Sequence, residues 1–442
     1  MASQAVIEEP QVEVTAPRWS PATRIAFRFC VLYFCLYSLS TQIITTLIVI
    51  PNLDLPDPAS LPPLRPIIGW TAAHLFHLAV TPTFFVETGS GDRPCDWVLI
   101  FCLLVLTIVG TILWSVFDRR RQSYAALRKW FWLFFRIALA GQMFTYGFAK
   151  VVPLQMPFPP LSRLLEPFGH FSPMGVLWYS IGASPAYEIF AGSAELLGGI
   201  LLVIPRTRTL GALICIADMT QVFMLNMTYD VPVKILSFTL ILLAILLVAP
   251  EFRSILNFFL LDRTAEPTAK TSLFRSLRAN RIAAIAQVVF ILWLLGTGAY
   301  GDRVAWKQYG GGVPQPALYG IWDVEQQTID GQLHPPLLTD SSRWRRILFD
   351  SHDLIIFQGM DDKNVYDRVA IDARANTLTV TPRANPNAKS TFTYARPATD
   401  RLVLDGVMDG HKLHMELALY DRNKFLIVSR GFHWVNPGPF NR

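Results

Sequence analysis

The chain has 442 residues, of which 52% are hydrophobic and 16% charged, and its formal net charge is +6. Soluble globular proteins carry about 25% charged residues, so the deficit indicates a membrane protein. The arginine clusters flank apolar runs and form no separate basic module, which argues against nucleic-acid binding.

The N-terminal part predicts a disordered tail and one membrane span. Residues 1–20 are acidic, polar and proline-containing, so we expect a disordered cytoplasmic segment and not a signal peptide. The span covers about 25–50, which exceeds the roughly 20 apolar residues that cross a bilayer. After a proline-rich loop, a short apolar segment carries His74 and His77. Their spacing places them on one helical face, where packed histidines are favoured over a ligand pair.

Six further apolar runs predict six more spans, which makes about seven in total. They cover approximately residues 97–117, 130–152, 186–204, 210–227, 235–248 and 282–300. Lys and Arg concentrate in alternate connections, and the positive-inside rule makes that side cytoplasmic. We therefore expect a bacterial inner-membrane protein with a cytoplasmic N-terminus and a C-terminal domain outside. The proline-rich stretch between the third and fourth spans predicts a short surface helix over the mouth of the bundle.

The composition changes near residue 301. Residues 301–317 read as a Gly/Pro linker, and 318–442 contain short segments with period-two alternation. Nine such segments, the last being KFLIVSR at 424–430, predict a small antiparallel β-barrel. The Gly320-Ile321-Trp322 opening resembles lipocalin-like barrels. The predicted fold is thus a mainly α-helical polytopic membrane protein followed by a small β-barrel-like domain.

Two acidic residues lie in the middle of predicted spans. Glu195 is in the fourth span and Asp218 in the fifth, and the short turn between these spans makes them antiparallel neighbours. Charge inside a bilayer is costly, so both are candidate catalytic groups. They could share a proton or accept one near a bound quinone. The alternative is that each carboxylate only holds neighbouring helices together.

Further polar residues in or beside the spans are candidate binding groups. Arg136 can reach the interface with its long side chain or pair with Glu195. Lys150 and Glu188 could form an ion pair at the bundle mouth. The remaining candidates are Gln142, Tyr146, Gln221, Asn226, Tyr229, Asp230 and Lys234. For Asp230 and Lys234 local pairing within their turn is the simpler interpretation.

Familiar chemical motifs are missing from the sequence. None of the five cysteines forms CxxC or accompanies histidine at zinc-ligand spacing, so no metal site is expected. Cys95 lies just before a span, in a loop that we expect outside the membrane. The sequence does not exclude a disulfide there, but Cys95 has no obvious local partner. We find no nucleophile elbow, P-loop or dinucleotide fingerprint. The chain therefore does not resemble a self-sufficient enzyme of a common class.

Three segments, RIALAGQMFTYGFAK, FAGSAELLGG and RTRTLGAL, resemble the DoxX-like bacterial membrane proteins. The matching positions are Arg136, Gly147, Lys150, Gly192, Glu195, Gly198, Gly199 and Arg208. The resemblance covers about residues 130–250 and implies a four-helix core. Residues 21–129 then hold two leading spans, and 251–300 a basic loop and the seventh span. Longer relatives with a tail like GFHWVNPGPFNR are similar too.

The DoxX-like resemblance implies a redox link, since some relatives are subunits of thiosulfate:quinone oxidoreductase. One hypothesis is therefore a quinone-linked accessory or subunit with a membrane or periplasmic redox partner, whose own catalytic activity is open. The other is a non-enzymatic, membrane-anchored carrier or assembly protein. In that case the outer β domain would bind a hydrophobic ligand or a partner.

Overall fold

The computed structural model describes residues 18–50, 55, 58, 62, 64–264 and 272–441. They divide into a helical unit, formed by residues up to 152 and by 188–304, and a second unit, formed by 153–187 and 305 onward. Residues 1–17 of the predicted disordered tail and most of the proline-rich loop lie outside the described residues.

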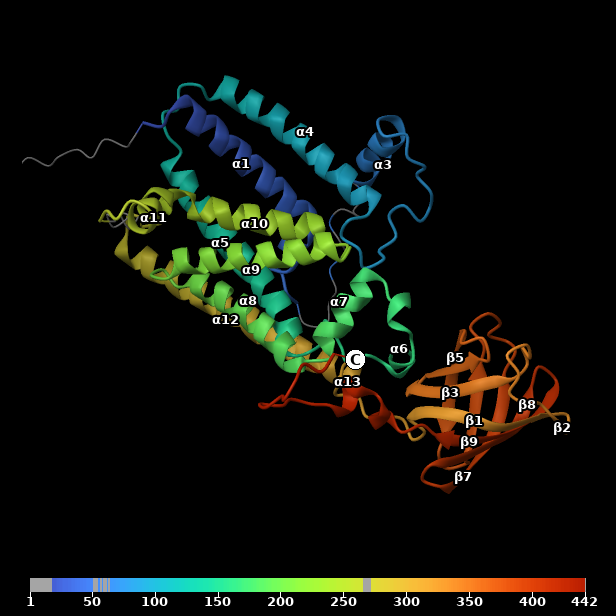
Figure 1. Cartoon of the computed structure of the whole chain (residues 1–442). Coiled ribbons are helices and arrows are strands. Elements are labelled where there is room, and N and C mark those ends of the chain that lie inside the picture. Colours follow the sequence, from blue (N-terminus) through green and yellow to red (C-terminus); the bar gives the residue numbers. More distant parts are fainter. Residues whose placement is uncertain are drawn as a thin grey trace, which may run out of the picture. The chain divides into compact units, whose positions relative to one another are not determined.

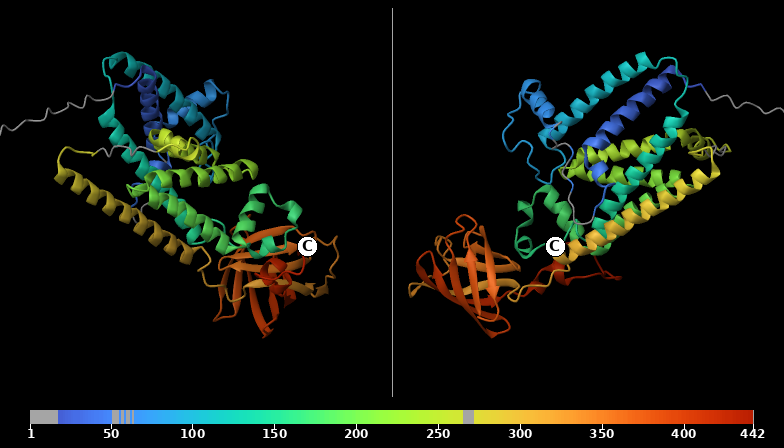
Figure 2. Two further views of the ribbon diagram at one scale, coloured as in Figure 1. Left: turned by 60° about the vertical axis from the view of Figure 1, so that its left-hand side comes forward. Right: turned by 180° about the vertical axis from the view of Figure 1, so that it is seen from behind.

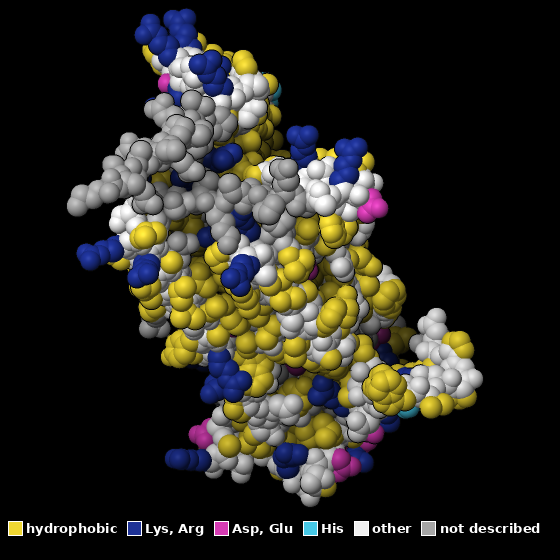
Figure 3. Space-filling view, turned by 90° about the vertical axis from the view of Figure 1, so that its left-hand side faces the viewer, with side chains coloured by type: hydrophobic (Ala, Val, Ile, Leu, Met, Phe, Trp, Pro, Cys, Tyr) yellow, Lys and Arg dark blue, Asp and Glu magenta, His cyan; other side chains and the backbone are white. Residues whose placement is uncertain are grey.

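Six helical stretches of the described chain are long and apolar enough to cross a membrane (Figure 1). They are α1 (Pro21–Ser40), α4 (Pro94–Phe117), α8 (Pro185–Val203), α9 (Arg208–Thr228), α10 (Lys234–Val248) continued by α11 (Phe252–Phe259), and α12 (Leu277–Gln308). Figure 3 shows many apolar side chains exposed on one face of the molecule. The helices are compatible with a multi-pass protein in a lipid bilayer, and the predicted fold class is confirmed.

The remaining predicted span, the third in chain order at about 130–152, is α5 (Ala125–Val151). At about 1.5 Å per residue it is long enough to cross a bilayer. Arg, Gln and Tyr side chains interrupt its apolar sequence, and it is not among the six candidate spans. Eleven of its residues are buried, among them Phe135 and Leu139 at 0% exposure. A helix enclosed by neighbouring helices meets little lipid, so it can carry polar groups that a lipid-facing helix cannot.

α1 ends at Ser40, well before the predicted end of the first span. Ser40 Oγ donates to the Leu36 carbonyl at 2.8 Å, and Thr41 Oγ1 donates to the Tyr37 carbonyl at 2.7 Å. Thr41 is extended, with φ −134° and ψ 176°. Hydroxyl groups that bond to backbone carbonyls compete with the helical pattern and favour a break.

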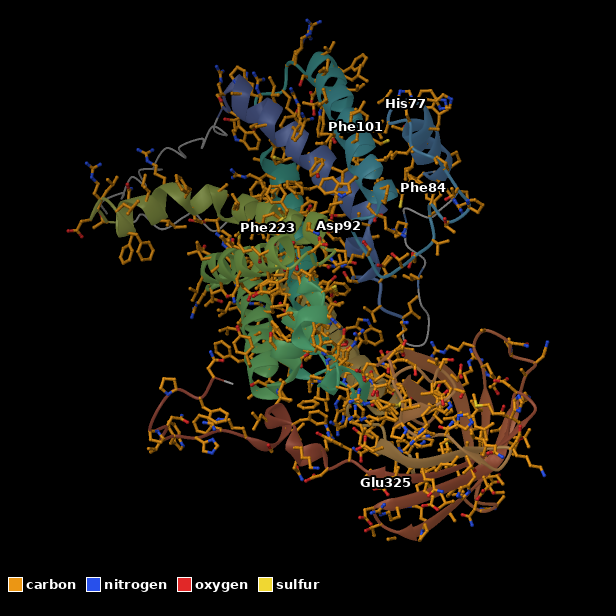
Figure 4. The ribbon with its side chains drawn as sticks, turned by 45° about the vertical axis from the view of Figure 1, so that its right-hand side comes forward. His77, Phe84, Asp92, Phe101, Phe223 and Glu325 are labelled. Atoms are coloured by element: carbon orange, nitrogen blue, oxygen red, sulfur yellow. The ribbon has the colours of Figure 1, made fainter. Side chains whose placement is uncertain are left out.

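The chain continues with two short helices, α2 (Gln42–Thr45) and α3 (Arg65–His74). His74 Nδ1 lies 2.9 Å from the Trp70 carbonyl oxygen, one turn back. His77 lies beyond the helix with φ 52° and is labelled in Figure 4. The prediction that both histidines share one helical face was therefore wrong, because the helix stops at the first of them.

The second unit contains a closed eight-stranded antiparallel barrel (Figure 2). Its strands are β1 (Gly320–Ile329), β3 (Trp344–Ser351), β4 (Leu354–Gly359), β5 (Asn364–Asp372), β6 (Thr377–Thr381), β7 (Ser390–Ala398), β8 (Arg401–Met408) and β9 (His411–Leu419). Each strand pairs with the next in this order, and β1 also pairs with β9. A two-residue strand, β2 (Gln332–Leu333), lies beside the end of β1. Closure leaves no long free sheet edge.

The interior of the barrel is filled. Sixteen buried apolar side chains form one core cluster, and Trp322 and Met415 are among the most enclosed, at 1% and 0% exposure. The indole nitrogen of Trp322 donates to the Leu318 carbonyl at 2.9 Å.

The pairing of β1 with β9 shifts register at Glu325, which is labelled in Figure 4.

Two segments at the ends of the barrel differ from the prediction. The predicted linker 301–317 is partly helical, because α12 runs to Gln308. The predicted strand KFLIVSR is a 3-10 turn, η4 (Arg422–Lys424), followed by a short helix, α13 (Leu426–Ser429). Its alternating side chains suggested a strand, but β9 already pairs on both sides, so a further strand has no edge to join.

Residues 153–187 belong to the barrel unit although they lie between two helices of the other unit in sequence. They contain α6 (Leu161–Leu164) and α7 (Pro173–Gly182). Leu161 packs in one buried cluster with Leu348 and Ile356 on the outer face of the barrel. Its backbone N–H donates to Asp350 Oδ1 at 3.2 Å. The surface helix expected over the bundle mouth is thus part of the barrel domain's own core.

Candidate functional site

The site begins with a close crossing of α5 and α8. A β-carbon added to Gly192 would lie 2.6 Å from the Gly147 carbonyl oxygen and 2.6 Å from Lys150 Cβ. Real β-carbons do not approach other atoms this closely, so only glycine permits this backbone contact. Small residues let membrane helices pack tightly. Here the contact brings the start of the Lys150 side chain directly against α8.

Lys150 reaches one turn along α8 to Glu195. Its Nζ lies 2.6 Å from Glu195 Oε1, and the two residues are 7% and 1% exposed. The second carboxylate oxygen, Oε2, is buried and has no hydrogen-bond partner among the described residues. An ion pair withdrawn from water is held by direct contact, and losing one partner leaves a buried charge uncompensated.

Asp218 brings a second carboxylate to the same level of the bundle. A β-carbon on Gly198 of α8 would lie 3.0 Å from Cys215 Sγ of α9, which fixes the register of these antiparallel helices. Three residues back on α8 is Glu195, and three residues forward on α9 is Asp218. Asp218 interacts electrostatically with both Glu195 and Lys150, and its Oδ2 is buried without a hydrogen-bond partner among the described residues. The site therefore combines two carboxylates with one ammonium group.

Tyr146 joins this charged group to a polar network. The Lys150 ammonium lies 5.8 Å from the centre of the Tyr146 ring. The Tyr146 hydroxyl accepts a hydrogen bond from Gln42 Nε2 at 2.7 Å, and the same nitrogen donates to Gln142 Oε1 at 3.2 Å. Gln142 in turn donates to Thr46 Oγ1. Side chains from α2 and α5 thus form a continuous set of donors and acceptors.

This network borders a cavity of about 360 Å³ within the helical unit. Tyr37, Gln42 and Tyr146 line it, together with the ion pair of Arg93 and Asp96. Two hydrogen bonds of 2.9 Å join that guanidinium to that carboxylate. Because Tyr146 both lines the cavity and contacts Lys150, a molecule in the cavity would lie one ring away from the charged group.

Several predicted residues have other roles. The Arg136 guanidinium donates to Gln287 Oε1 on α12 at 2.9 Å, and the cation that pairs with Glu195 is Lys150 instead. Glu188 is fully buried, but the ion pair of Lys150 is with Glu195, two turns further along α8. Gln221 is exposed on α9. None of these three is brought to the cavity.

The candidates near the turn between α9 and α10 are structural. Asn226 Nδ2 donates to Ser237 Oγ at 3.0 Å and so joins the two helices. Lys234 Nζ lies 3.0 Å from Asp230 Oδ1, which confirms the expected local pairing. Tyr229 is the residue that follows α9 and is partly buried.

Sequence reasoning missed Asp92, which is labelled in Figure 4. Its carboxylate accepts hydrogen bonds from the backbone N–H groups of Lys234 at 2.8 Å and Ile235 at 3.0 Å. It therefore caps the N-terminus of α10 from a distant loop, and a negative charge there also complements the helix dipole. Gln42 was missed as well, although the polar run Thr41-Gln42-Thr45-Thr46 within an apolar segment was a usable signal.

Cysteine and metal chemistry find no support in the described part of the chain. All five cysteines are free thiols, and Cys95 is buried at the start of α4. Among the described residues no group of three or more His, Cys, Asp or Glu side chains could hold a metal ion.

Comparison with known proteins gives one relative of note. The chain is 32% identical over 143 residues to the uncharacterized protein YwoB of Bacillus subtilis (strain 168), and the match covers 30% of this chain and 85% of the relative. The chain belongs to the YwoB family. Nearly all of YwoB thus corresponds to under a third of this chain. No family model and no solved structure matches.

Proposed function

We propose that this chain is a DoxX-like protein of the bacterial inner membrane that binds a quinone-type ring beside Lys150 and Glu195, as an accessory of a redox system. The cavity lined by Tyr146, whose ring separates it from the Lys150–Glu195 pair, carries the proposal. Its volume of about 360 Å³ lies within the range of small-molecule sites. A site of this kind combines apolar walls with a few polar groups that orient the ligand.

The donors at the cavity suit a ring that carries carbonyl oxygens. The Gln42 amide and the Tyr146 hydroxyl can both donate, and they already contact each other at 2.7 Å. Buried carbonyl oxygens of a ligand need such partners, because an unpaired acceptor in an apolar site is costly. The apolar helices around the cavity would admit a lipid-soluble molecule directly from the bilayer.

The two carboxylates would serve proton transfer. Reduction of a quinone to a quinol takes up two electrons and two protons. The electrons must come from a redox protein that works with this chain. Glu195 and Asp218 each have one oxygen without a hydrogen-bond partner in the described structure, where a proton can be held. A positioned group of this kind is what general acid catalysis requires.

The orientation in the membrane belongs to the same proposal. A cytoplasmic N-terminus and an outer barrel domain would follow from the distribution of Lys and Arg between the spans. The barrel would then face a periplasmic partner.

The alternative is a non-enzymatic carrier or assembly protein. A carrier whose barrel binds a hydrophobic ligand is not favoured, because sixteen apolar side chains fill the barrel interior. A partner-binding role for the barrel's outer surface is compatible with the structure, but no observation in the helical unit calls for it.

The test is quinone retention. The protein is extracted with its surrounding lipid in polymer nanodiscs, and quinone per protein is measured after solvent extraction. We expect near-stoichiometric quinone for the wild type and at least a fivefold loss for Tyr146→Phe and Gln42→Leu. The matched control is Tyr300→Phe on the exposed face of α12, where Tyr300 is 67% exposed. Equal quinone in all four proteins would refute the proposal.

A further inference from the structure

The segment that follows the last barrel strand exposes an unusual set of apolar side chains. Phe432, Trp434 and Val435 are 76%, 91% and 82% exposed, and Leu426 and Ile427 are about half exposed. Large exposed apolar patches on a folded domain mark surfaces that another molecule covers. We refer to residues 426–440 as the C-terminal loop.

The C-terminal loop is held in a defined shape. The Arg430 guanidinium lies 3.8 Å from the centre of the Phe440 ring and donates to Asn436 Oδ1 at 2.9 Å. Asn436 Nδ2 donates to the His433 carbonyl at 3.2 Å. The start and end of the loop are thereby tied together, and the rings of Phe432 and Trp434 meet edge to face at 5.0 Å near its tip. The exposed aromatics are thus presented by a folded loop.

The positive charge of the C-terminal loop and of the residues just before it favours contact with a negatively charged surface. Residues 422–441 include Arg422, Lys424 and Arg430 and no aspartate or glutamate. Cationic side chains beside exposed Trp and Phe are typical of segments that lie in the interface of an anionic bilayer. Each Lys or Arg near such a surface adds attraction to the acidic lipid headgroups.

We propose that the C-terminal loop is a membrane-surface anchor, in which Phe432 and Trp434 insert among the headgroups of anionic lipids. The barrel unit is covalently tethered to the six apolar helices, because the chain passes between the two units more than once. The loop gives the barrel domain a contact with the membrane that is separate from the spans. This inference does not depend on the quinone proposal.

The backbone of the loop offers a sensitive readout. None of the amides of residues 431–439 donates to a backbone carbonyl in the described structure. They should exchange with solvent deuterium quickly unless another surface covers them. Slow exchange in this segment therefore reports coverage of the loop rather than its internal structure.

The experiment compares hydrogen exchange of the full-length protein in nanodiscs of phosphatidylcholine alone and with one third phosphatidylglycerol. We expect exchange of residues 431–439 to be at least tenfold slower in the anionic discs. The protection should disappear in the double variant Phe432→Ser and Trp434→Ser. It should persist in the control Leu337→Ser and Leu338→Ser, whose exposed leucines lie beside Asp340 instead of cationic residues.

Two results would overturn the proposal. One is equal exchange of the loop in neutral and anionic discs. The other is protection that arises only after a second protein is added, which would identify the loop as a protein-docking surface. Peptides from β3 and β4 serve as an internal check that each variant keeps the barrel folded.

Discussion

The Lys150 ammonium bonds to one oxygen of the Glu195 carboxylate at 2.6 Å, and the other oxygen has no hydrogen-bond partner in the described structure. With Asp218 at the same level, one cation faces two carboxylates. This imbalance makes the three residues unequal in their expected effects on stability, and it distinguishes a shared charged site from a simple ion pair.

Lys150→Met should be the most damaging single change at the site. It leaves two carboxylates without a cation between α5, α8 and α9. Breaking a buried ion pair in this way costs about 3–5 kcal/mol. The measurement is thermal unfolding of the protein in nanodiscs. Adding Glu195→Gln to this variant should restore part of the loss, because the second change removes the uncompensated charge. If the double variant unfolds at a lower temperature than Lys150→Met, the pair is not coupled as described.

Asp218 should act as a reserve partner for Lys150. We expect Asp218→Asn to leave the stability unchanged or to raise it, since it removes one excess negative charge. Glu195→Gln should cost less than Lys150→Met, because Asp218 can still neutralise the ammonium. Combining Glu195→Gln with Asp218→Asn should then approach the cost of Lys150→Met. Additive effects of these two changes would mean that Asp218 does not interact with Lys150.

Gly192→Ala tests the helix crossing that positions the ion pair. The new methyl group would lie 2.6 Å from the Gly147 carbonyl oxygen, so α5 and α8 must move apart. Overpacking of this kind costs about 1–3 kcal/mol, and it should lower the melting temperature. Gly296→Ala in α12 is the matched control, because among the described residues no atom outside its own stretch of helix lies within 4 Å of the added β-carbon. Alanine is the better helix former there by about 1 kcal/mol, so the control should be neutral or stabilising.

Leu161→Ala should destabilise the barrel unit. Leu161 is 1% exposed and covers Leu348 and Ile356, both at 0%. Truncating a buried leucine costs about 2–5 kcal/mol. Hydrogen exchange should quicken in β3 and β4 while α9 and α10 keep their protection. Unchanged exchange in those strands would show that α6 is not part of the barrel's core. A fragment starting at residue 313 would lack this cover and should aggregate.

Asp350 should make the barrel unit less stable at neutral than at acidic pH. Burial raises the pKa of its carboxyl group, although the Leu161 N–H bond opposes this. A raised pKa means that the folded state holds the proton more tightly than the unfolded state. The stabilisation from protonation is therefore complete below the unfolded pKa and is lost as the pH rises through the folded pKa.

The variant Asp350→Asn should remove this dependence. Its amide oxygen can still accept from Leu161, and no charge is buried. Melting curves between pH 3 and pH 7 should show a smaller fall in stability with rising pH than the wild type does. Parallel curves for the two proteins would assign the pH dependence to other groups.

Local patterns predicted most of the elements. Apolar runs identified α4, α8, α9 and α10 to within a few residues, because hydrophobic length alone determines such helices. Period-two alternation identified the eight barrel strands, because successive side chains of a strand point to opposite faces of the sheet. The failures came where tertiary structure decides: the strand predicted at 424–430 found no free edge, and α1 ended early at hydroxyl side chains.

The site was predicted in part. Glu195, Asp218, Lys150 and Tyr146 were singled out because polar groups inside apolar spans are rare. The closeness of Glu195 and Asp218 was expected from the short turn between their helices. The pairing of Lys150 with Glu195 was not predicted, since it depends on which turn of α5 meets which turn of α8. The partner of Arg136 is Gln287, more than a hundred residues away in sequence, and no local pattern reveals such a contact.

The position of α6 on the barrel has a consequence for how the protein is made. During synthesis Leu161 leaves the ribosome 195 residues before Ile356, the strand residue that it will cover. At about 5–20 residues per second this is a delay on the order of ten seconds or more. For that time an apolar turn between two nascent membrane helices has no surface to pack on. The barrel unit completes its core only with a segment far ahead of it in the sequence, so the barrel cannot be exchanged between proteins as a simple C-terminal module.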